Sequence, residues 1–496
     1  MYPWEIYDMR RKGILSIVTG FVMIVGVLMA VSCAINPATG SPDLMLVSKE
    51  DEIKLGQQTD TGVIGEYGLY ADQRLTGYVG EMGQRLGALS HRPELDWHFK
   101  ILDVSVVNAF AAPGGYVYFT RGILAALNSE AELAGIMGHE IGHITARHSA
   151  QQISKAKVAQ YGLAGVSIGL SILGIPGLSS LAEAGVGVLF LKFSRDNERE
   201  ADSLGVEYAT KAGYDASHMA DFFETLKRME SKADRSGLPD WFSTHPSPED
   251  RERAIRTQFT QMQKKTGLKD AKIDREGYLR AIDGMVYGDD PRQGYVEGNV
   301  YYHPTMRIRF PVPAEWVVND TPAAVQMVSK KKDAVILFSG APGTTPFDAA
   351  QKHVSKTGAR VLKSDSTRVN GFSAHWVVAE VASRKGTLKV MSLFIQKEKE
   401  ILGFHGLSSP RLFPQYESLF KSTMNGFSEL SDPRKINVQP SRIRARFTKK
   451  TDTIENALRA LGVPDHKLKD TVILNGMTSG QNTPAHTLLK VIEHGR

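Results

Sequence analysis

The chain has almost no cysteine: Cys33 is the only one among its 496 residues. This excludes an intrachain disulfide and requires any zinc site to take its ligands from histidine, glutamate and aspartate. A strong excess of charge is also absent, because 60 Lys and Arg residues face 54 Asp and Glu residues and leave a net charge of +6. A charge spread this thinly does not form the basic patch of a nucleic-acid-binding protein, so we expect no nucleic-acid partner.

Long apolar runs are rare as well, and the clearest one lies near the N-terminus. Ile14 to Ala30 is apolar and follows the basic residues 10–12, which is the order of a signal peptide. The run leads to Cys33, and the small or apolar residues before this cysteine resemble a bacterial lipobox. We therefore predict a lipoprotein-type signal segment over residues 1–33 with a lipidated Cys33. The alternative is an uncleaved signal anchor, because about 20 apolar residues can span a bilayer.

Both alternatives attach the protein to a bacterial membrane and leave its body on the periplasmic side, in the cell envelope. Ala34, directly after the cysteine, resembles a sorting signal for the outer membrane. We therefore expect an outer-membrane lipoprotein.

A second apolar stretch, residues 158–193, is rich in glycine and interrupted by a Gly-Ile-Pro-Gly sequence at residues 174–177. These interruptions argue against a membrane span and predict two apolar helices joined by a turn. The two helices either pack in the core, cover the functional site or dip into a membrane surface.

The strongest functional pattern is HExxH, formed by His139, Glu140 and His143. Histidines at positions i and i+4 lie on one face of a helix, so both imidazoles can bind one metal ion. Glu140 lies close enough to a metal-bound water to act as its general base. Ser129 followed by Glu132 is a capping-box pattern, which predicts that a helix begins there.

A catalytic zinc needs a third protein ligand, and the sequence favours a carboxylate on a later helix. The metzincin pattern would place a histidine six residues after His143, but that residue is Ser149. Glu198 and Asp202 are spaced as i and i+4, so we expect Glu198 to bind the metal and Asp202 to orient a ligand histidine. Glu200 is the nearest competitor but points to a different face. A solvated helix crossed by salt bridges is the alternative for this segment.

The segment before the metal helix contains a possible substrate-binding strand. Asn108, Ala109 and Phe110 precede the turn at residues 113–115. An edge strand at this position could bind an extended peptide through backbone hydrogen bonds. The alternative is an ordinary hairpin in the core.

Together these residues resemble a known family, the gluzincin metallopeptidases of family forty-eight, which include the CAAX prenyl protease, HtpX and the BepA-like periplasmic proteases. The resemblance covers residues 48–263, and the chain is more similar to the soluble, exported branch than to the multispanning ones. It implies a zincin-type fold that is mainly helical with a small β-hairpin or sheet, one Zn²⁺ per chain, and protein substrates that are misfolded or belong to the envelope. The motifs that carry it are HExxH, ExxxD from Glu198, Thr244-His245-Pro246, Asn108-Ala109-Phe110, Pro113-Gly114-Gly115 and Thr120-Arg121-Gly122.

His245 is expected near the zinc, presented from a rigid turn because proline restricts the residue before it to extended conformations. It either stabilises the oxyanion of the tetrahedral intermediate or, as the resemblance to BepA-like proteases suggests, fills the open zinc position and holds the enzyme inactive. A capping role before the next helix is the third reading. Arg251 is expected to hold a substrate carbonyl or carboxylate.

The rest of the chain predicts further domains and an α+β multidomain architecture. Residues 295–428 alternate apolar and polar residues and predict an α+β accessory domain without a catalytic constellation. Residues 446–496 resemble a LysM module with βααβ order. The expected divisions are a signal segment (1–33), a tether (34–47), the metalloprotease domain (48–263), a linker (264–294), the accessory domain (295–428), a linker (429–445) and the LysM-like module (446–496).

The function predicted from the sequence is that of an exported, membrane-tethered zinc endopeptidase. Its partners would be protein substrates, the membrane, and peptidoglycan or the envelope assembly machinery. Two alternatives stay open: a periplasmic chaperone or assembly scaffold with a latent zinc site, and a cell-wall-binding protein.

Overall fold

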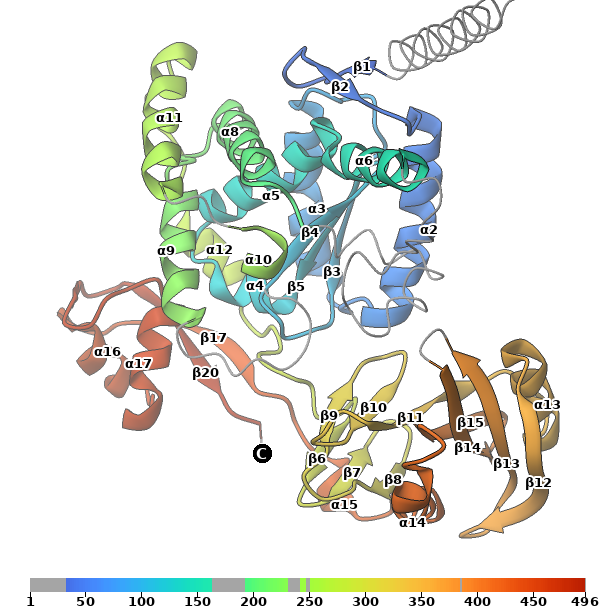
Figure 1. Cartoon of the computed structure of the whole chain (residues 1–496). Coiled ribbons are helices and arrows are strands. Elements are labelled where there is room, and N and C mark those ends of the chain that lie inside the picture. The colour runs from blue at the N-terminus through green and yellow to red at the C-terminus, as the bar shows by residue number, and fades with distance from the viewer. Residues whose placement is uncertain (1–32, 163–191, 231–240, 247–249, 384–385, 496) are drawn as a thin grey trace, which may run out of the picture.

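The computed structural model describes residues 33–162, 192–230, 241–246, 250–383 and 386–495. It contains helices and several separate sheets, which confirms the expected α+β class (Figure 1). Among these residues no helix combines the length and the apolar composition that crossing a membrane requires. Most of the predicted signal segment and most of the predicted pair of apolar helices lie outside the described residues.

The described chain begins with a short hairpin. Strands β1 (Cys33–Ile35) and β2 (Pro42–Leu44) pair antiparallel, with Cys33 opposite Leu44. The segment expected to be a tether is therefore partly folded, and Figure 1 shows this hairpin at the edge of the helical part of the molecule, close to α2 and α6.

The helical region, residues 49–281, surrounds a three-stranded sheet of order β3-β5-β4. β3 and β5 are parallel, and β4 is antiparallel to β5. Among the described residues β4 lies at an edge of this sheet, where the sequence predicts an edge strand. The elements are α2 (Lys49–Tyr67), α3 (Gln73–Ala88), β3 (His98–Leu102), β4 (Ala109–Ala112), β5 (Tyr116–Thr120), α4 (Arg121–Ala126), α5 (Glu130–Thr145), α6 (His148–Gly162), α8 (Arg195–Lys211), α9 (His218–Glu230), α10 (Trp241–Thr244), α11 (Arg251–Thr266) and α12 (Arg275–Ala281).

Helices α5 and α8 pack unusually closely because each presents a glycine to the other. A Cβ on Gly138 would lie 2.8 Å from the Gly205 carbonyl oxygen, and a Cβ on Gly205 would lie 2.9 Å from the His139 nitrogen. An alanine at either position would force the helices apart, at a cost of about 1–3 kcal/mol. This contact brings the carboxylates of α8 against the histidines of α5.

The accessory region, residues 295–429, contains a seven-stranded antiparallel sheet of order β12-β13-β14-β15-β11-β10-β9 and a four-stranded sheet of order β16-β8-β7-β6. The two sheets share one apolar core, which includes Phe310, Phe338 and Phe404. The elements are β6 (Tyr295–Glu297), β7 (Val300–His303), β8 (Ile308–Pro311), β9 (Val317–Asp320), β10 (Val325–Val328), β11 (Ala334–Ala341), α13 (Pro346–Thr357), β12 (Arg360–Val369), β13 (Phe372–Ser383), β14 (Gly386–Lys397), β15 (Glu400–Ser408), α14 (Phe413–Asn425) and β16 (Ser428–Glu429).

The C-terminal module, residues 442–493, has two outer strands and two helices in the expected order strand, helix, helix, strand, and β17 pairs antiparallel with β20. β17 begins at Arg442, four residues before the expected boundary. The buried Lys490 ammonium donates to the carbonyls of Ala125 (2.7 Å) and Leu127 (2.8 Å), just before the metal helix. The likeness to LysM stays a prediction. The elements are α15 (Pro433–Ile436), β17 (Arg442–Phe447), β18 (Asp452–Thr453), α16 (Ile454–Ala460), α17 (Asp465–Leu474), β19 (Asn482–Thr483) and β20 (Leu488–Glu493).

Candidate metal centre

Helix α5 begins where the capping pattern predicts. The Ser129 hydroxyl accepts a hydrogen bond from the Glu132 backbone nitrogen at 3.1 Å. The Glu132 carboxylate accepts one from the backbone nitrogen of Asn128 at 2.8 Å, one residue earlier than in the usual capping box. All residues of α5 are buried, so both histidines of HExxH project into the interior of the protein.

Four potential ligand atoms converge on one point, from His139, His143, Glu198 and His245, and lie within 4.8 Å of one another. The Nε2 atoms of the two α5 histidines are 3.1 Å apart. His245 Nδ1 lies 3.4 Å from His139 Nε2 and 3.1 Å from Glu198 Oε1, and His143 Nε2 lies 3.5 Å from the same oxygen. A tetrahedral zinc with bonds of about 2.0–2.1 Å has ligand–ligand separations of about 3.4 Å. These four atoms therefore fit zinc.

At three of these four groups the electrostatics favour the protonation states that a metal requires, whereas at His245 burial is outweighed by the carboxylates of Glu198 and Glu140, which raise the pKa of this imidazole. Burial lowers the pKa of His139 and of His143 well below the ordinary value, so both imidazoles are neutral. Burial opposes ionisation of Glu198, but His245, His139 and Arg251 outweigh it and lower the pKa of this carboxyl. Neutral imidazoles and an ionised carboxylate are the forms that donate lone pairs to a metal.

Glu140 is buried beside this cluster, with 1% of its surface exposed. Neither of its carboxylate oxygens has a hydrogen-bond partner among the described residues. Burial is the main cause that raises the pKa of Glu140 to about 7. His245 Nε2 is 3.7 Å from Glu140 Oε1, so His245 lies between this carboxylate and the other ligand atoms. A buried carboxylate without a partner beside a ligand set is the arrangement expected of a general base in a metallohydrolase.

His245 lies near the cluster, as expected, and contacts with the preceding helix hold it there. The residue follows the one-turn helix α10, and its backbone nitrogen donates to the Trp241 carbonyl at 2.8 Å. Its ring stacks on the Trp241 indole with centroids 4.3 Å apart and planes 21° apart. The hydrogen bond to the preceding helix and the aromatic stacking therefore fix its position. The extended backbone expected before proline stays a prediction.

Asp202 lies where the sequence predicts, with Oδ1 2.9 Å from His139 Nδ1. Arg251 binds the same carboxylate. Its Nη2 donates to Asp202 Oδ1 at 2.7 Å, and its guanidinium lies 3.7 Å from the Phe223 ring centroid. Arg251 is only 1% exposed, and its bond to Asp202 supports a residue of the cluster. Its Nε and Nη1 have no hydrogen-bond partner among the described residues, and the role of holding a substrate carbonyl or carboxylate stays a prediction.

Two residues of the site were not predicted. His148 Nδ1 lies 2.9 Å from His143 Nδ1, and His148 Nε2 lies 3.4 Å from Glu200 Oε2. Glu200 points away from the ligand atoms, as expected, and reaches His148 instead. The sequence carried a weak signal, because His148 is the next histidine after the HExxH helix, but its orientation depends on a backbone reversal that spacing does not reveal.

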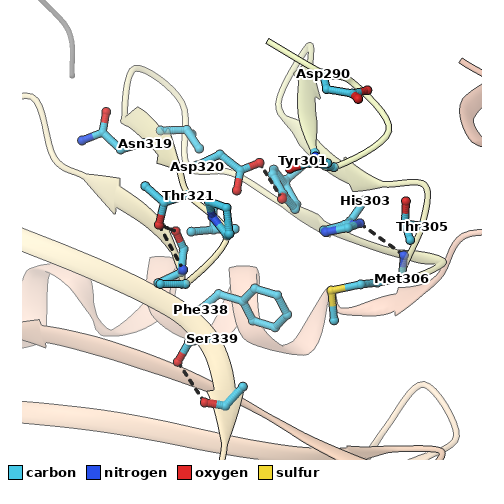
Figure 2. A pocket seen from close by; sticks show the side chains of 18 of the residues that line it. Asp290, Tyr301, His303, Thr305, Met306, Asn319, Asp320, Thr321, Phe338 and Ser339 are labelled. Atoms are coloured by element: carbon cyan, nitrogen blue, oxygen red, sulfur yellow. Dashed lines mark hydrogen bonds between the residues drawn. The ribbon is translucent and has the colours of Figure 1, made fainter. Parts of the chain in front are cut away.

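A cavity of about 1100 Å³ lies elsewhere, between the helical and accessory regions. Figure 2 shows Tyr301 donating to Asp320 at 2.7 Å in this cavity, with His303 nearby. Burial raises the pKa of Asp320 to about 7 and lowers that of His303 to about 4. Within the described chain, no group of metal ligands is found there.

Comparison with known proteins identifies part of the chain. Residues 73–258 match the model of Peptidase family M48. The Beta-barrel assembly-enhancing protease of Yersinia pestis is 30% identical over 235 residues, which cover 46% of this chain and 47% of that protein. The Mitochondrial metalloendopeptidase OMA1 of Schizosaccharomyces pombe is 33% identical over 229 residues, covering 45% of this chain and 66% of that protein.

The match with the first of these relatives spans about half of that protein's length. Among solved structures, cyanobacterial PsbP from Synechocystis sp. PCC 6803 aligns with 27% of this chain and 96% of its own, with 13% identity and a TM-score of 0.23. A similarity this low supports no conclusion about the fold.

Proposed function

Residues 73–258 belong to peptidase family M48, and from this premise we propose that the whole protein is a membrane-tethered zinc endopeptidase of the cell envelope. One observation carries the proposal: the ligand atoms of His139, His143 and Glu198 converge beside the buried carboxylate of Glu140, which accepts no hydrogen bond among the described residues. Three protein ligands and an adjacent general base are the parts that metal-assisted hydrolysis of a peptide bond requires.

The roles of these residues follow from their positions. His139, His143 and Glu198 would hold zinc, which when bound supplies Lewis acidity toward a carbonyl and acidifies a water. Glu140 would accept the proton of the attacking water and return it to the leaving amine. Asp202 would hold His139 in the tautomer whose Nε2 faces the metal.

We infer that the described arrangement is the inactive form. His245 Nδ1 belongs to the ligand group, and its other nitrogen faces Glu140. A histidine in this position would act as a fourth protein ligand of a bound zinc and would keep water away from Glu140. His245 would therefore have to leave the metal before a substrate is cut. The protein would then be a protease whose zinc site is latent until His245 moves.

An extended substrate would bind along β4. This strand has only one neighbour in its sheet within the described chain, and it packs against α5. Of the predicted residues Asn108, Ala109 and Phe110, the last two would then offer backbone groups to the substrate, because both backbone groups of Asn108 already bond to Thr120. The relatives' name, Beta-barrel assembly-enhancing protease, supports envelope proteins as the substrate class.

Attachment to the membrane would use a lipid on Cys33. The arrangement of a basic start, an apolar run and a cysteine supports it. Mass spectrometry of the mature N-terminus tests it: a lipidated Cys33 that is lost in Cys33→Ser supports the tether, and an intact Met1 would favour the signal anchor.

The function itself is tested by incubating the purified protein with casein, a denatured protein and a panel of envelope proteins. We expect cleavage that stops on zinc removal and is absent in Glu140→Gln. A protein that cleaves none of these substrates even as His245→Ala, yet pulls down peptidoglycan, would favour the cell-wall-binding alternative.

A further inference from the structure

The two histidines of α5 are held by different supports. His139 Nδ1 faces one carboxylate, that of Asp202, directly. His143 Nδ1 instead faces a second imidazole, His148, which in turn faces Glu200. The support of His143 therefore contains one residue more than that of His139. This residue, His148, extends the polar contacts away from the metal centre.

Backbone geometry builds this longer connection. Arg147 has a φ of 58°, in the left-handed region, so the chain reverses sharply between α5 and α6. The reversal turns His148, the first residue of α6, back toward α5. On α8, Glu200 lies about 200° around the helix axis from Glu198, because each residue advances about 100°. Glu200 therefore faces α6, while Glu198 faces the metal centre.

Proton positions along the connection follow from the role of His143. If its Nε2 is to bind a metal, a neutral His143 carries its proton on Nδ1 and donates it to His148 Nδ1. His148 then carries its own proton on Nε2, toward Glu200 Oε2 at 3.4 Å. The ionised carboxylate at the end makes the His143 nitrogen at the metal more basic.

The connection continues into the β1–β2 hairpin through Asn36. This residue is 2% exposed, and its amide nitrogen donates to Glu200 Oε1 and to Asp43 Oδ2, both at 3.1 Å. Its amide oxygen accepts from the backbone nitrogen of Ala38 at 2.9 Å, which holds the turn of the hairpin. A second contact holds the hairpin in place, because Gln151 on α6 donates to Asp43 Oδ2 at 2.8 Å.

We propose that Asn36, Glu200 and His148 form a chain of positioning residues through which the docked β1–β2 hairpin orients His143 and strengthens metal binding. The hairpin starts at Cys33, so the segment that would carry the membrane anchor ends three residues from a buried contact of this chain. Displacing the hairpin removes Asn36 from Glu200. Glu200 then holds His148 less firmly, so His148 can rotate and orients His143 less well. The inference rests on the proposed function only in taking His143 as a metal ligand.

The test compares Glu200→Gln and Asn36→Ala with two matched controls. Glu207→Gln changes the same residue type on the same helix, where the carboxylate pairs with Lys211 instead. Thr39→Ala changes an exposed residue in the same hairpin. Zinc affinity is measured by competition with a chelator, and the geometry of the site is followed by the visible absorption of the cobalt-substituted protein.

We expect Glu200→Gln to weaken zinc binding about tenfold, since losing an outer partner of a ligand histidine costs about 10–100-fold. Asn36→Ala should weaken it about threefold, as it acts one step further away. Both variants should shift the cobalt spectrum, while the controls match wild type. Thermal unfolding of the metal-free proteins separates this effect from loss of the fold.

Wild-type zinc affinity and cobalt spectra in both Glu200→Gln and Asn36→Ala would overturn the inference. If Glu200→Gln does not fold, Asn36→Ala alone decides, because its side chain lies outside the helices of the metal centre. These readouts need no substrate. A protein that binds zinc as predicted but cleaves nothing would therefore refute the proposed function and leave the inference standing.

Discussion

Two regions of this molecule bring histidines together, and among the described residues only the helical region groups them with a carboxylate as potential metal ligands. In the helical region, His139 and His143 lie with ring centroids 4.7 Å apart. In the accessory region, His353 and His405 stack at 4.4 Å. Burial is the main cause that lowers the pKa of these imidazoles in both places, with that of His405 falling to about 3.

The difference lies in the groups that the rings face. His405 Nδ1 lies 2.9 Å from the Ser392 hydroxyl, and His375 lies between the hydroxyls of Ser364 and Ser366. The histidines of α5 face the carboxylates of α8, which the glycine contact between these helices brings close. Imidazoles with a lowered pKa therefore do not identify a metal site by themselves. The feature that does is a facing helix that carries several carboxylates.

The largest effect expected from breaking this arrangement is that of Glu140→Gln. The amide keeps the shape of the side chain but cannot accept a proton, so turnover should fall by about 10²–10⁴-fold while zinc stays bound. Initial rates of casein cleavage and the zinc content of the same sample measure both quantities. Normal turnover in this variant would contradict the mechanism.

The next effect concerns zinc binding and is expected when a ligand is removed. Glu198→Ala should weaken zinc binding by more than about a hundredfold, beyond the loss that the outer partners of a ligand cause. Equilibrium dialysis against zinc buffers, with Glu200→Ala alongside, measures this. Wild-type affinity in Glu198→Ala together with a severe loss in Glu200→Ala would move the ligand assignment to Glu200.

Removal of His245 should have a moderate effect of the opposite sign. His245→Ala opens the fourth position at the metal, so basal proteolysis should rise several-fold while zinc remains on its other ligands. Casein cleavage at matched zinc occupancy reports the sign. A fall of about a hundredfold with zinc retained would instead assign His245 to the oxyanion.

The smallest effect is expected in the other histidine cluster. His405→Gln should leave zinc content and casein cleavage unchanged, because no carboxylate completes a ligand set there among the described residues. The change should cost about 1 kcal/mol of stability, as polar substitutions in a packed core commonly do. Thermal unfolding checks the second quantity. Loss of zinc from this variant would contradict the prediction, because it would show that the His405 cluster also takes part in metal binding.

Much of the metal centre could be predicted from the sequence because its signals are local. Helical spacing placed His139 and His143 on one face, and it separated Glu198 and Asp202 from Glu200. The capping pattern at Ser129 located the start of α5. These inferences need only the geometry of a single helix.

Other features depend on the packing of distant segments and could not be predicted. The position of His148 depends on the left-handed conformation of Arg147. Arg251 donates a hydrogen bond to Asp202, which lies on another helix. The one-turn helix before His245 is held partly by stacking on Trp241. Residue spacing along the chain does not encode such contacts.

X-ray absorption at the zinc edge tests the central claim most directly, because it counts and identifies the ligands in solution. The arrangement described here predicts one zinc per chain with three imidazole nitrogens and one carboxylate oxygen at about 2.0–2.2 Å. In His245→Ala one imidazole should be replaced by a water oxygen. A wild-type spectrum with only two imidazoles, unchanged in His245→Ala, would contradict both the four-ligand centre and the inactive form assigned to it.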